Sequence, residues 1–295
     1  MSAPRNKRGT DGRLYLQHGP IELIIEMFGD RDEVEQAQAQ AVAAFDGLLD
    51  GLVAELPLLR RPLGVAYPML RGTIAQAMAR AAWPHRDEFI TPMAAVAGAV
   101  ADHMLAAAIK GRCLEKGYVN NGGDIALYLS PGASLDAGVV TDLAAVGFRG
   151  GLSGHVSLHH DLAVRGIATS GWRGRSHSRG IADAVTVLAG CAAQADAAAT
   201  MIANRVDINH RGIERVPANS LDPDSDLGEL AVTVAVNAAD LGEEARRAAL
   251  LAGVDRARGL LAQGVIVGAL LALGDQAASV GQLGGAALLH EGQRP

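Results

Sequence analysis

The chain has 295 residues, of which 49% are hydrophobic, and this is ample for a large buried core. Its net charge of −6 excludes a broad basic surface, so nucleic acids and anionic membranes are poor partner candidates. The two cysteines, Cys113 and Cys191, are too few for a disulfide scaffold. Because the N-terminus also lacks the apolar core of a secretory signal, we expect a cytoplasmic protein with reduced thiols.

We expect residues 1–12 and 284–295 to be loosely held tails around a single domain of residues 13–283. The first half of this domain shows the period of strands and then that of helices. The predicted elements are strands at 13–18 and 21–28, then helices at 32–56, 68–82 and 93–109. The last helix has Ala or Gly at most positions and must pack closely against something. Asp102 and His103 are expected near its solvent side.

The stretch 118–130 predicts two short strands separated by a polar, glycine-containing string. This string consists of Asn120, Asn121, Gly122, Gly123 and Asp124. It is typical of a hairpin turn. Its strongly apolar flanks also fit a buried loop, in which glycines let a ligand approach the backbone closely. The sequence leaves both interpretations open.

The second half of the chain continues the mixture of strands and helices. Its predicted elements are strands at 138–145, 152–158, 164–168, 181–189, 230–236 and 264–273, loops at 169–180 and 205–226, and helices at 191–204 and 242–263. His159 and His160 point to opposite faces of an extended segment and are expected at the surface. Because many strands come as adjacent pairs without a βαβ rhythm, we predict an α+β fold of layered, mostly antiparallel sheets with packed helices.

Two oxygen-bearing side chains share a face of the alanine-rich helix at 191–204. Asp196 and Thr200 lie four residues apart, and the carboxylate is favoured near the helix N-terminus. Magnesium and calcium ions take oxygen ligands, so this pair is a candidate cation site. The alternative is that Asp196 helps to begin the helix and Thr200 merely packs, since such a pair is common.

Four segments, in their order and spacing, resemble the ApbE superfamily. Within it, the chain is most similar to the uncharacterised ApbE-like family rather than to the FAD:protein FMN transferases proper. The segments are 119–127 (VNNGGDIAL), 166–171 (GIATSG), 176–178 (SHS) leading to 184–189 (AVTVLA), and 195–200 (ADAAAT), with 91–102 as a weaker fifth match. The resemblance implies an ApbE-like, T-fold-like α+β architecture.

The resemblance also implies an activity: transfer of FMN from FAD to a Thr or Ser of an acceptor protein, with Mg²⁺ or Ca²⁺ as the cation. Asp196 and Thr200 match the metal-holding positions, with a backbone carbonyl near residues 95–98. His177 matches a histidine close to the transferred phosphate and is the candidate base. The implied flavin-binding residues are Asn120, Asn121, Gly122, Gly123, Asp124, Thr169, Ser170 and Gly171. Arg173 and Arg175, in a basic cluster with Arg179, suit a small anionic ligand.

The chain departs from the transferase pattern in four places, among them an N-terminal flavin-gripping segment that is not recognisable and an insert at 172–175. Residues 96–99 contain no Lys where the transferases have one, and the connection at 178–183 after His177 is shorter. Three hypotheses therefore stay open: a metal-dependent enzyme acting on a flavin nucleotide or related phosphate compound, a non-catalytic flavin- or cofactor-binding protein, and an enzyme of another reaction type. The many Ala and Gly residues could form flat packing surfaces and are compatible with a homodimer.

Overall fold

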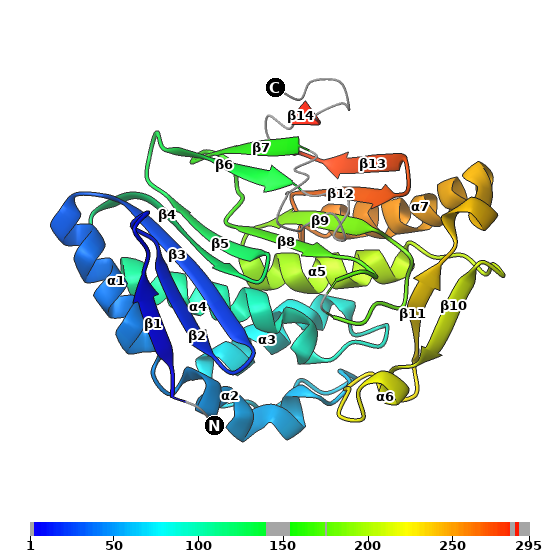
Figure 1. Cartoon of the computed structure of the whole chain (residues 1–295), viewed down its shortest axis with the longest axis horizontal. Helices are drawn as coiled ribbons and strands as arrows, with labels where there is room; N and C mark the ends of the chain where they lie inside the picture. Colours follow the sequence, from blue (N-terminus) through cyan, green and yellow to red (C-terminus); the bar gives the residue numbers. More distant parts are fainter. Residues whose placement is uncertain (1–2, 140–153, 175, 284–286, 289–295) are drawn as a thin grey trace. The chain divides into compact units, whose positions relative to one another are not determined.

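The computed structural model describes residues 3–139, 154–174, 176–283 and 287–288 (Figure 1). It is an α+β structure whose strands pair mostly antiparallel, so the predicted fold class is confirmed. The chain divides into two compact units that interleave along the sequence. Unit 1 comprises Met1–Leu135, His159–Ala168 and Ala189–Ala197, and unit 2 comprises Asp136–Leu158, Thr169–Leu188 and Ala198–Pro295.

Unit 1 contains an antiparallel sheet built from sequential hairpins. Its strands are β1 (Arg5–Arg8), β2 (Leu14–His18), β3 (Ile21–Gly29), β4 (Leu114–Asn121) and β5 (Asp124–Leu129), with β8 (Gly166–Ser170) paired to β5. Buried and more exposed residues alternate along β2 and β3, because one face of each strand packs on the core. The predicted N-terminal tail contains β1, so for Arg5–Arg8 the expectation of a loosely held segment is wrong.

Four α-helices accompany this sheet. They are α1 (Arg31–Phe45), α2 (Leu48–Leu59), α3 (Thr73–Ala82) and α4 (Val96–Ile109), with the short 3-10 helices η1 (Trp83–His85) and η2 (Pro92–Ala95). The single helix predicted at 32–56 is wrong, because Gly47 adopts a left-handed conformation with φ 71° and separates α1 from α2. Pro57 does not end the helix but lies inside α2. The predicted helix at 68–82 begins only at Thr73.

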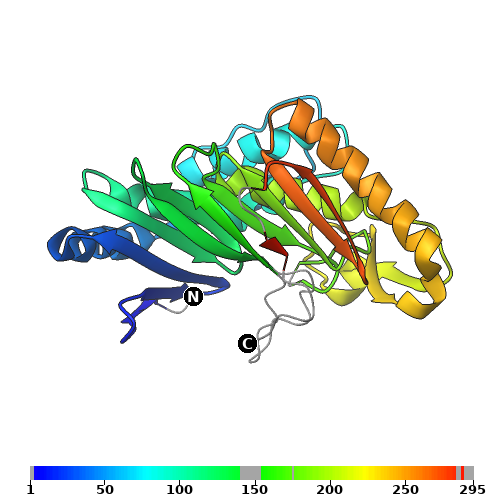
Figure 2. The same cartoon turned by 90° about the horizontal axis from the view of Figure 1, so that it is seen from above.

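Unit 2 contains three strand groups and a long helix. β9 (Ala184–Ala189), β12 (Gly268–Leu273) and β13 (Gln276–Gly281) form an antiparallel set, and β10 (Ile213–Pro217) pairs with β11 (Ala231–Val236). β7 (Gly154–His159) lies between β6 (Ser134–Val139) and β14 (Ala287–Leu288). The helix α7 (Ala238–Ala262) packs along β12 and β13 (Figure 2). β9 and β12 are buried at every position, which explains why their sequences are apolar except for the hydrogen-bonded Thr186 in β9.

Several predicted boundaries in the second half need correction. The loop predicted at 205–226 contains β10 and the short helix α6 (Ala218–Leu221), and the predicted C-terminal tail contains β14. The strands predicted at 138–145 and 152–158 lie partly outside the described residues. The alanine-rich helix is present as α5 (Ala192–Arg205), within one residue of its predicted bounds.

One described helical stretch, Pro92–Ile109, is long and apolar enough to cross a membrane by length and composition. Half of this stretch is buried inside the protein, as expected for a core helix. The stretch comprises η2 and α4, and its small side chains position the site described next.

Candidate functional site

The first feature of the site is a very close approach between α4 and the start of α5 at Gly98. A Cβ atom added to Gly98 would lie 2.3 Å from the backbone oxygen of Ala192 and 2.7 Å from the backbone nitrogen of Ala193. No side chain can occupy that space without moving a backbone. The glycine is therefore required by packing, as the small side chains of this helix predicted.

Asp102 on α4 holds the N-terminus of α5. Its two carboxylate oxygens accept hydrogen bonds from the backbone nitrogens of Ala192 and Ala193, both at 2.9 Å. Burial raises the pKa of Asp102, while these two hydrogen bonds oppose the rise. The prediction that Asp102 lies on the solvent side is wrong, because its carboxylate satisfies backbone donors that the helix itself leaves unpaired.

Two further groups near Asp102 are also removed from water. The neighbouring His103 is half-buried, and burial lowers the pKa of its imidazole. Burial, together with the negative charge of Asp102, raises the pKa of the Cys191 thiol to about 11. Cys191 is therefore held in its neutral form, which makes it a poor nucleophile or metal ligand at neutral pH.

Asp196 lies one turn further along α5 and contacts the first turn of α4. Its Oδ2 atom accepts a hydrogen bond of 3.0 Å from the backbone nitrogen of Gly98. Burial first, and then the negative charge of Asp124, raise the pKa of the Asp196 carboxyl well above its ordinary value. The sequence pattern did not show that these two carboxylates, 72 positions apart in the chain, are close enough to interact.

The hairpin between β4 and β5 brings Asn121 and Asp124 to the same region of unit 1. Gly122 and Gly123 form its two-residue turn with φ angles of 66° and 116°, so the hairpin interpretation is confirmed. The buried Asn121 donates its side-chain Nδ2 proton to the backbone oxygen of Ala97 at 3.0 Å. Asn120, in contrast, accepts a hydrogen bond from the backbone nitrogen of Gly123 and closes the turn.

The backbone at residues 97–98 is therefore the centre of this cluster, which we call the α4 site. Asp196 accepts from Gly98 and Asn121 donates to Ala97, while Asp124 acts on Asp196 through its charge. In the described part of the chain, no group of three or more His, Cys, Asp or Glu residues has the geometry of a metal site. Any cation here would thus draw on two carboxylates together with neutral oxygens or ligand atoms.

Thr200 lies on α5 one helical turn after Asp196, and its side chain is partly exposed. Its predicted role as a metal ligand stays a prediction. The alternative that Asp196 begins the helix does not hold, because Asp102 accepts from the first amides of α5.

The remaining predicted residues lie in unit 2, at the end of β8 and on the connection from β8 to β9. Thr169 shares a hydrogen bond of 2.9 Å with the hydroxyl of Thr186, and Ser170 ends β8. A Cβ atom on Gly171 would lie 2.4 Å from the backbone oxygen of Asp183. His177 is exposed to solvent, and Arg175 lies outside the described residues.

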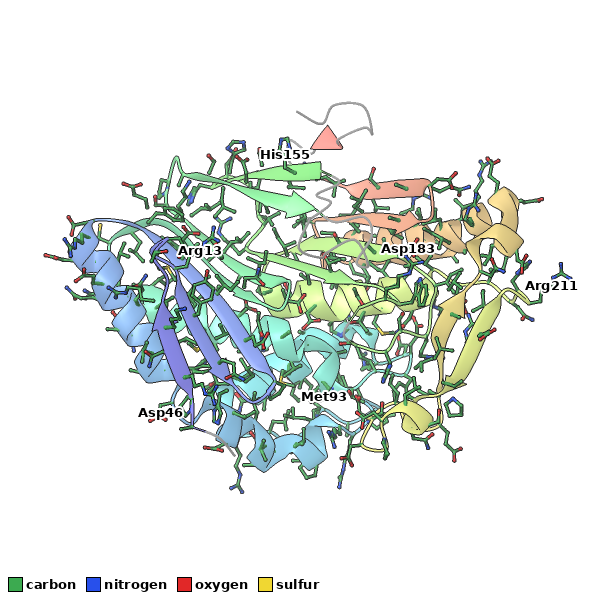
Figure 3. All side chains as sticks on the ribbon, viewed as in Figure 1. Arg13, Asp46, Met93, His155, Asp183 and Arg211 are labelled. Carbon is green, nitrogen blue, oxygen red and sulfur yellow. The ribbon has the colours of Figure 1, made fainter. Side chains whose placement is uncertain are left out.

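Asp183, which is labelled in Figure 3, organises this connection, and the sequence patterns did not single it out. Its carboxylate accepts from the Trp172 indole nitrogen at 3.1 Å and from the Gly274 backbone nitrogen at 2.6 Å. The guanidinium of Arg173 lies 4.8 Å above the Trp172 ring and 3.9 Å from the Asp183 carboxylate. A pocket of about 160 Å³ is lined in part by Arg173, Asp183 and Arg246. Binding of an anion by Arg173 stays a prediction.

Comparison with known proteins identifies the family. The model of the family described as "AbpE bacteria", an ApbE-like family, matches residues 5–283. The chain belongs to this family. It is 34% identical over 218 residues to a UPF0280 protein of Methanopyrus kandleri, covering 72% of this chain and 83% of the relative. It is 35% identical over 161 residues to a UPF0280 protein of Methanosphaerula palustris, covering 54% of this chain and 63% of the relative.

Among solved structures, the chain is similar to the apo crystal structure of the flavinyl transferase ApbE from Pseudomonas stutzeri. The identity is 12% and the TM-score is 0.40, with 95% of each chain covered. The predicted membership of an ApbE-like family, made from the four sequence segments, is confirmed by the family match.

Proposed function

We propose that this ApbE-like protein is a metal-dependent enzyme that acts on a flavin nucleotide or a related phosphate compound. The observation that carries this proposal is the α4 site, where burial and then the negative charge of Asp124 raise the pKa of Asp196. Two carboxylates that repel one another in a partly buried site cost stability unless a proton or a cation offsets their charge. Their oxygens are the donors that hard divalent cations prefer.

The small number of carboxylates favours a cation that is shared with the substrate. Magnesium is usually bound through one or two carboxylates, waters and substrate phosphates, rather than through a complete protein cage. Asp196 and Asp124 fit this donor set, with Thr200 as a further candidate. A cation held there would supply positive charge against the phosphate oxygens of a nucleotide. We favour Mg²⁺ over Ca²⁺, because Ca²⁺ takes six to eight oxygen ligands.

The other residues would serve binding and proton transfer. In the transfer reaction, the hydroxyl oxygen of a Thr or Ser acceptor forms a bond to the FMN phosphorus. The pyrophosphate bond of FAD breaks, and AMP leaves with the bridging oxygen. The exposed His177 is accessible to an acceptor protein and would take the hydroxyl proton. The hairpin at 120–124 in unit 1 would contact the flavin beside the cation. For Thr169, Ser170 and Gly171 in unit 2 we propose flavin binding, and for Arg173 phosphate binding, as the resemblance implies.

A specific feature favours non-catalytic cofactor binding as the second candidate function. The transferases that the chain resembles carry a Lys in the helix corresponding to α4, whereas residues 96–99 are Val, Ala, Gly and Ala. At Gly98 in particular, the backbone of Ala192 leaves no room for a side chain. The protein would then bind the nucleotide without transferring it.

We further propose that the protein works in the cytoplasm. Cys113 and Cys191 are both free thiols in the structure, as in proteins of reducing compartments.

The test is a titration of the full chain with FAD, FMN and ADP, each with and without Mg²⁺, followed by flavin fluorescence and thermal unfolding. We expect FAD to raise the melting temperature only when Mg²⁺ is present, because protein and phosphate oxygens share the cation. Asp196→Asn should remove this response. Asp207→Asn is the matched control, since burial also raises the pKa of Asp207 but Arg215 in unit 2 is its ion-pair partner.

The outcomes separate the candidates. Stabilisation followed by FMN transfer to a Ser- or Thr-containing acceptor supports the enzyme, and stabilisation without transfer supports the binding protein. An unchanged Mg²⁺ response in Asp196→Asn would remove Asp196 from the cation site. No response to any of the three nucleotides would refute both flavin functions.

A further inference from the structure

The outer side of α2 is an apolar helix face that the described residues of this chain leave uncovered. Asp50, Val53, Ala54 and Pro57 follow the i, i+3, i+4, i+7 spacing of one helical stripe, and all four are exposed. The opposite side buries Leu48, Leu49, Leu52 and Leu59. Three of the four exposed residues are apolar, so this stripe lacks the polar surface that a solvent-facing helix normally carries.

A loop bonded to α2 extends this apolar surface. Val65 and Met69 are 103% and 90% exposed, although the loop is held firmly at both ends. Leu63 is buried and donates its backbone proton to Ile90, and the Gln76 side chain donates to the backbone oxygen of the buried Leu70. The exposure of Val65 and Met69 is therefore a property of an anchored loop.

The loop is tied directly to the helix. The Glu55 carboxylate on α2 accepts hydrogen bonds of 2.7 Å from the backbone nitrogens of Arg71 and Gly72. Four of the seven large hydrophobic side chains that are exposed in the described part of the chain belong to α2 or this loop: Val53, Val65, Tyr67 and Met69. Such a concentration of exposed apolar side chains marks an interaction surface.

The charges at the two ends of α2 indicate what covers this surface. Asp46 and Asp50 are exposed at the N-terminal end, and Arg60 and Arg61 are exposed at the C-terminal end (Figure 3 labels Asp46). A second copy of α2 laid antiparallel across the first would place each acidic end against a basic end. The helix has 12 residues and is therefore about 18 Å long, so both pairs of ends can meet in one symmetric contact.

We propose that the outer face of α2, with the loop at residues 63–70, is the interface of a homodimer in which two copies of α2 pack antiparallel about a twofold axis. The small side chain of Ala54 lets the backbones of the two helices approach closely. Val53, Val65 and Met69 supply the apolar contact, and the charged ends fix the antiparallel direction. Tyr, Met and Arg are residue types enriched in protein interfaces, and this surface contains no Lys.

The test is sedimentation velocity of the full chain over a wide range of concentration. We expect a dimer in the wild type that weakens at high salt, because the charged ends are screened. Val53→Asp should give a monomer that still folds, with the circular dichroism spectrum of the wild type, since Val53 is 40% exposed within one copy. Leu251→Asp on α7 is the matched control, because Leu251 is similarly exposed at 49%, and it should leave the dimer intact.

A charge exchange tests the antiparallel direction. Asp50→Arg should weaken dimerisation by about tenfold or more, because the new positive charge faces Arg60 and Arg61 of the second copy. Adding Arg60→Asp to the same chain should restore much of the lost affinity. A wild type that is monomeric at every concentration, or a dimer that Val53→Asp leaves intact, would overturn the proposal. A dimer that the charge exchange does not restore would overturn the antiparallel arrangement.

Discussion

The contact between α4 and α5 makes a sharp prediction for Gly98→Ala. In an ordinary helix interior this substitution stabilises a protein by about 1 kcal/mol, because Gly loses more backbone entropy on folding. At Gly98 the added methyl group would lie 2.3 Å from the backbone oxygen of Ala192, which cannot rotate away as a side chain would. Overpacking of this kind costs about 1–3 kcal/mol, and here the upper end applies because the obstacle is main chain.

We therefore expect Gly98→Ala to lower the free energy of unfolding by about 2 kcal/mol after the propensity gain is subtracted. For a chain of 295 residues, that corresponds to a fall of roughly 3 °C in melting temperature. The matched control is Gly259→Ala in α7, where a Cβ atom meets nothing within 4 Å. Gly259→Ala should raise stability by about 0.5–1 kcal/mol.

The assay is chemical and thermal unfolding of both variants, monitored by circular dichroism. The opposite signs of the two effects are the decisive result. If Gly98→Ala is as stable as the wild type or more stable, then α4 and α5 are not in backbone contact at Gly98. The geometry of the α4 site, which depends on the hydrogen bond from Gly98 to Asp196, would then also be wrong.

Two further predictions concern the buried carboxylates. Asp102→Ala should lower the free energy of unfolding by about 2–3 kcal/mol in the same assay, because the backbone nitrogens of Ala192 and Ala193 lose their acceptor. Asp102→Asn keeps one acceptor oxygen and should cost less. Equal losses in the two variants would argue against capping by Asp102. Asp196 has a raised pKa in the folded state, so without cations its contribution to stability is present below its ordinary pKa of 3.8 and is lost as the pH rises through the raised value. Asp196→Asn should therefore be more stable than the wild type at neutral pH without Mg²⁺, and this difference in stability should vanish in acid. A variant that is less stable than the wild type at neutral pH would contradict the repulsion from Asp124.

Local sequence patterns determined the class of the fold and the family. Apolar alternation and the turn glycines at 122–123 predicted antiparallel hairpins, since a two-residue turn can only join antiparallel neighbours. The alanine-rich segments predicted α4 and α5, and their small side chains predicted close packing. The order of four short segments identified the ApbE-like family.

Other features required the tertiary structure. The break of the first long helix depends on the left-handed conformation of Gly47, and a single Gly within an amphipathic pattern does not show that conformation. The sequence placed Asp102 on the solvent side, because a lone carboxylate in a helix is usually solvated. Only the packing of α4 against α5 turned it into the cap of a helix 90 positions away.

The same distinction holds for the α4 site. The sequence marked Asp196 through its spacing to Thr200, and marked Asp124 through the glycine-containing hairpin. It contained no sign that the two carboxylates interact, because helical and strand periods describe neighbours within a few residues, whereas Asp124 and Asp196 meet through the packing of separate elements. The residue types were therefore readable in the sequence, and their electrostatic coupling was decided by the tertiary fold alone.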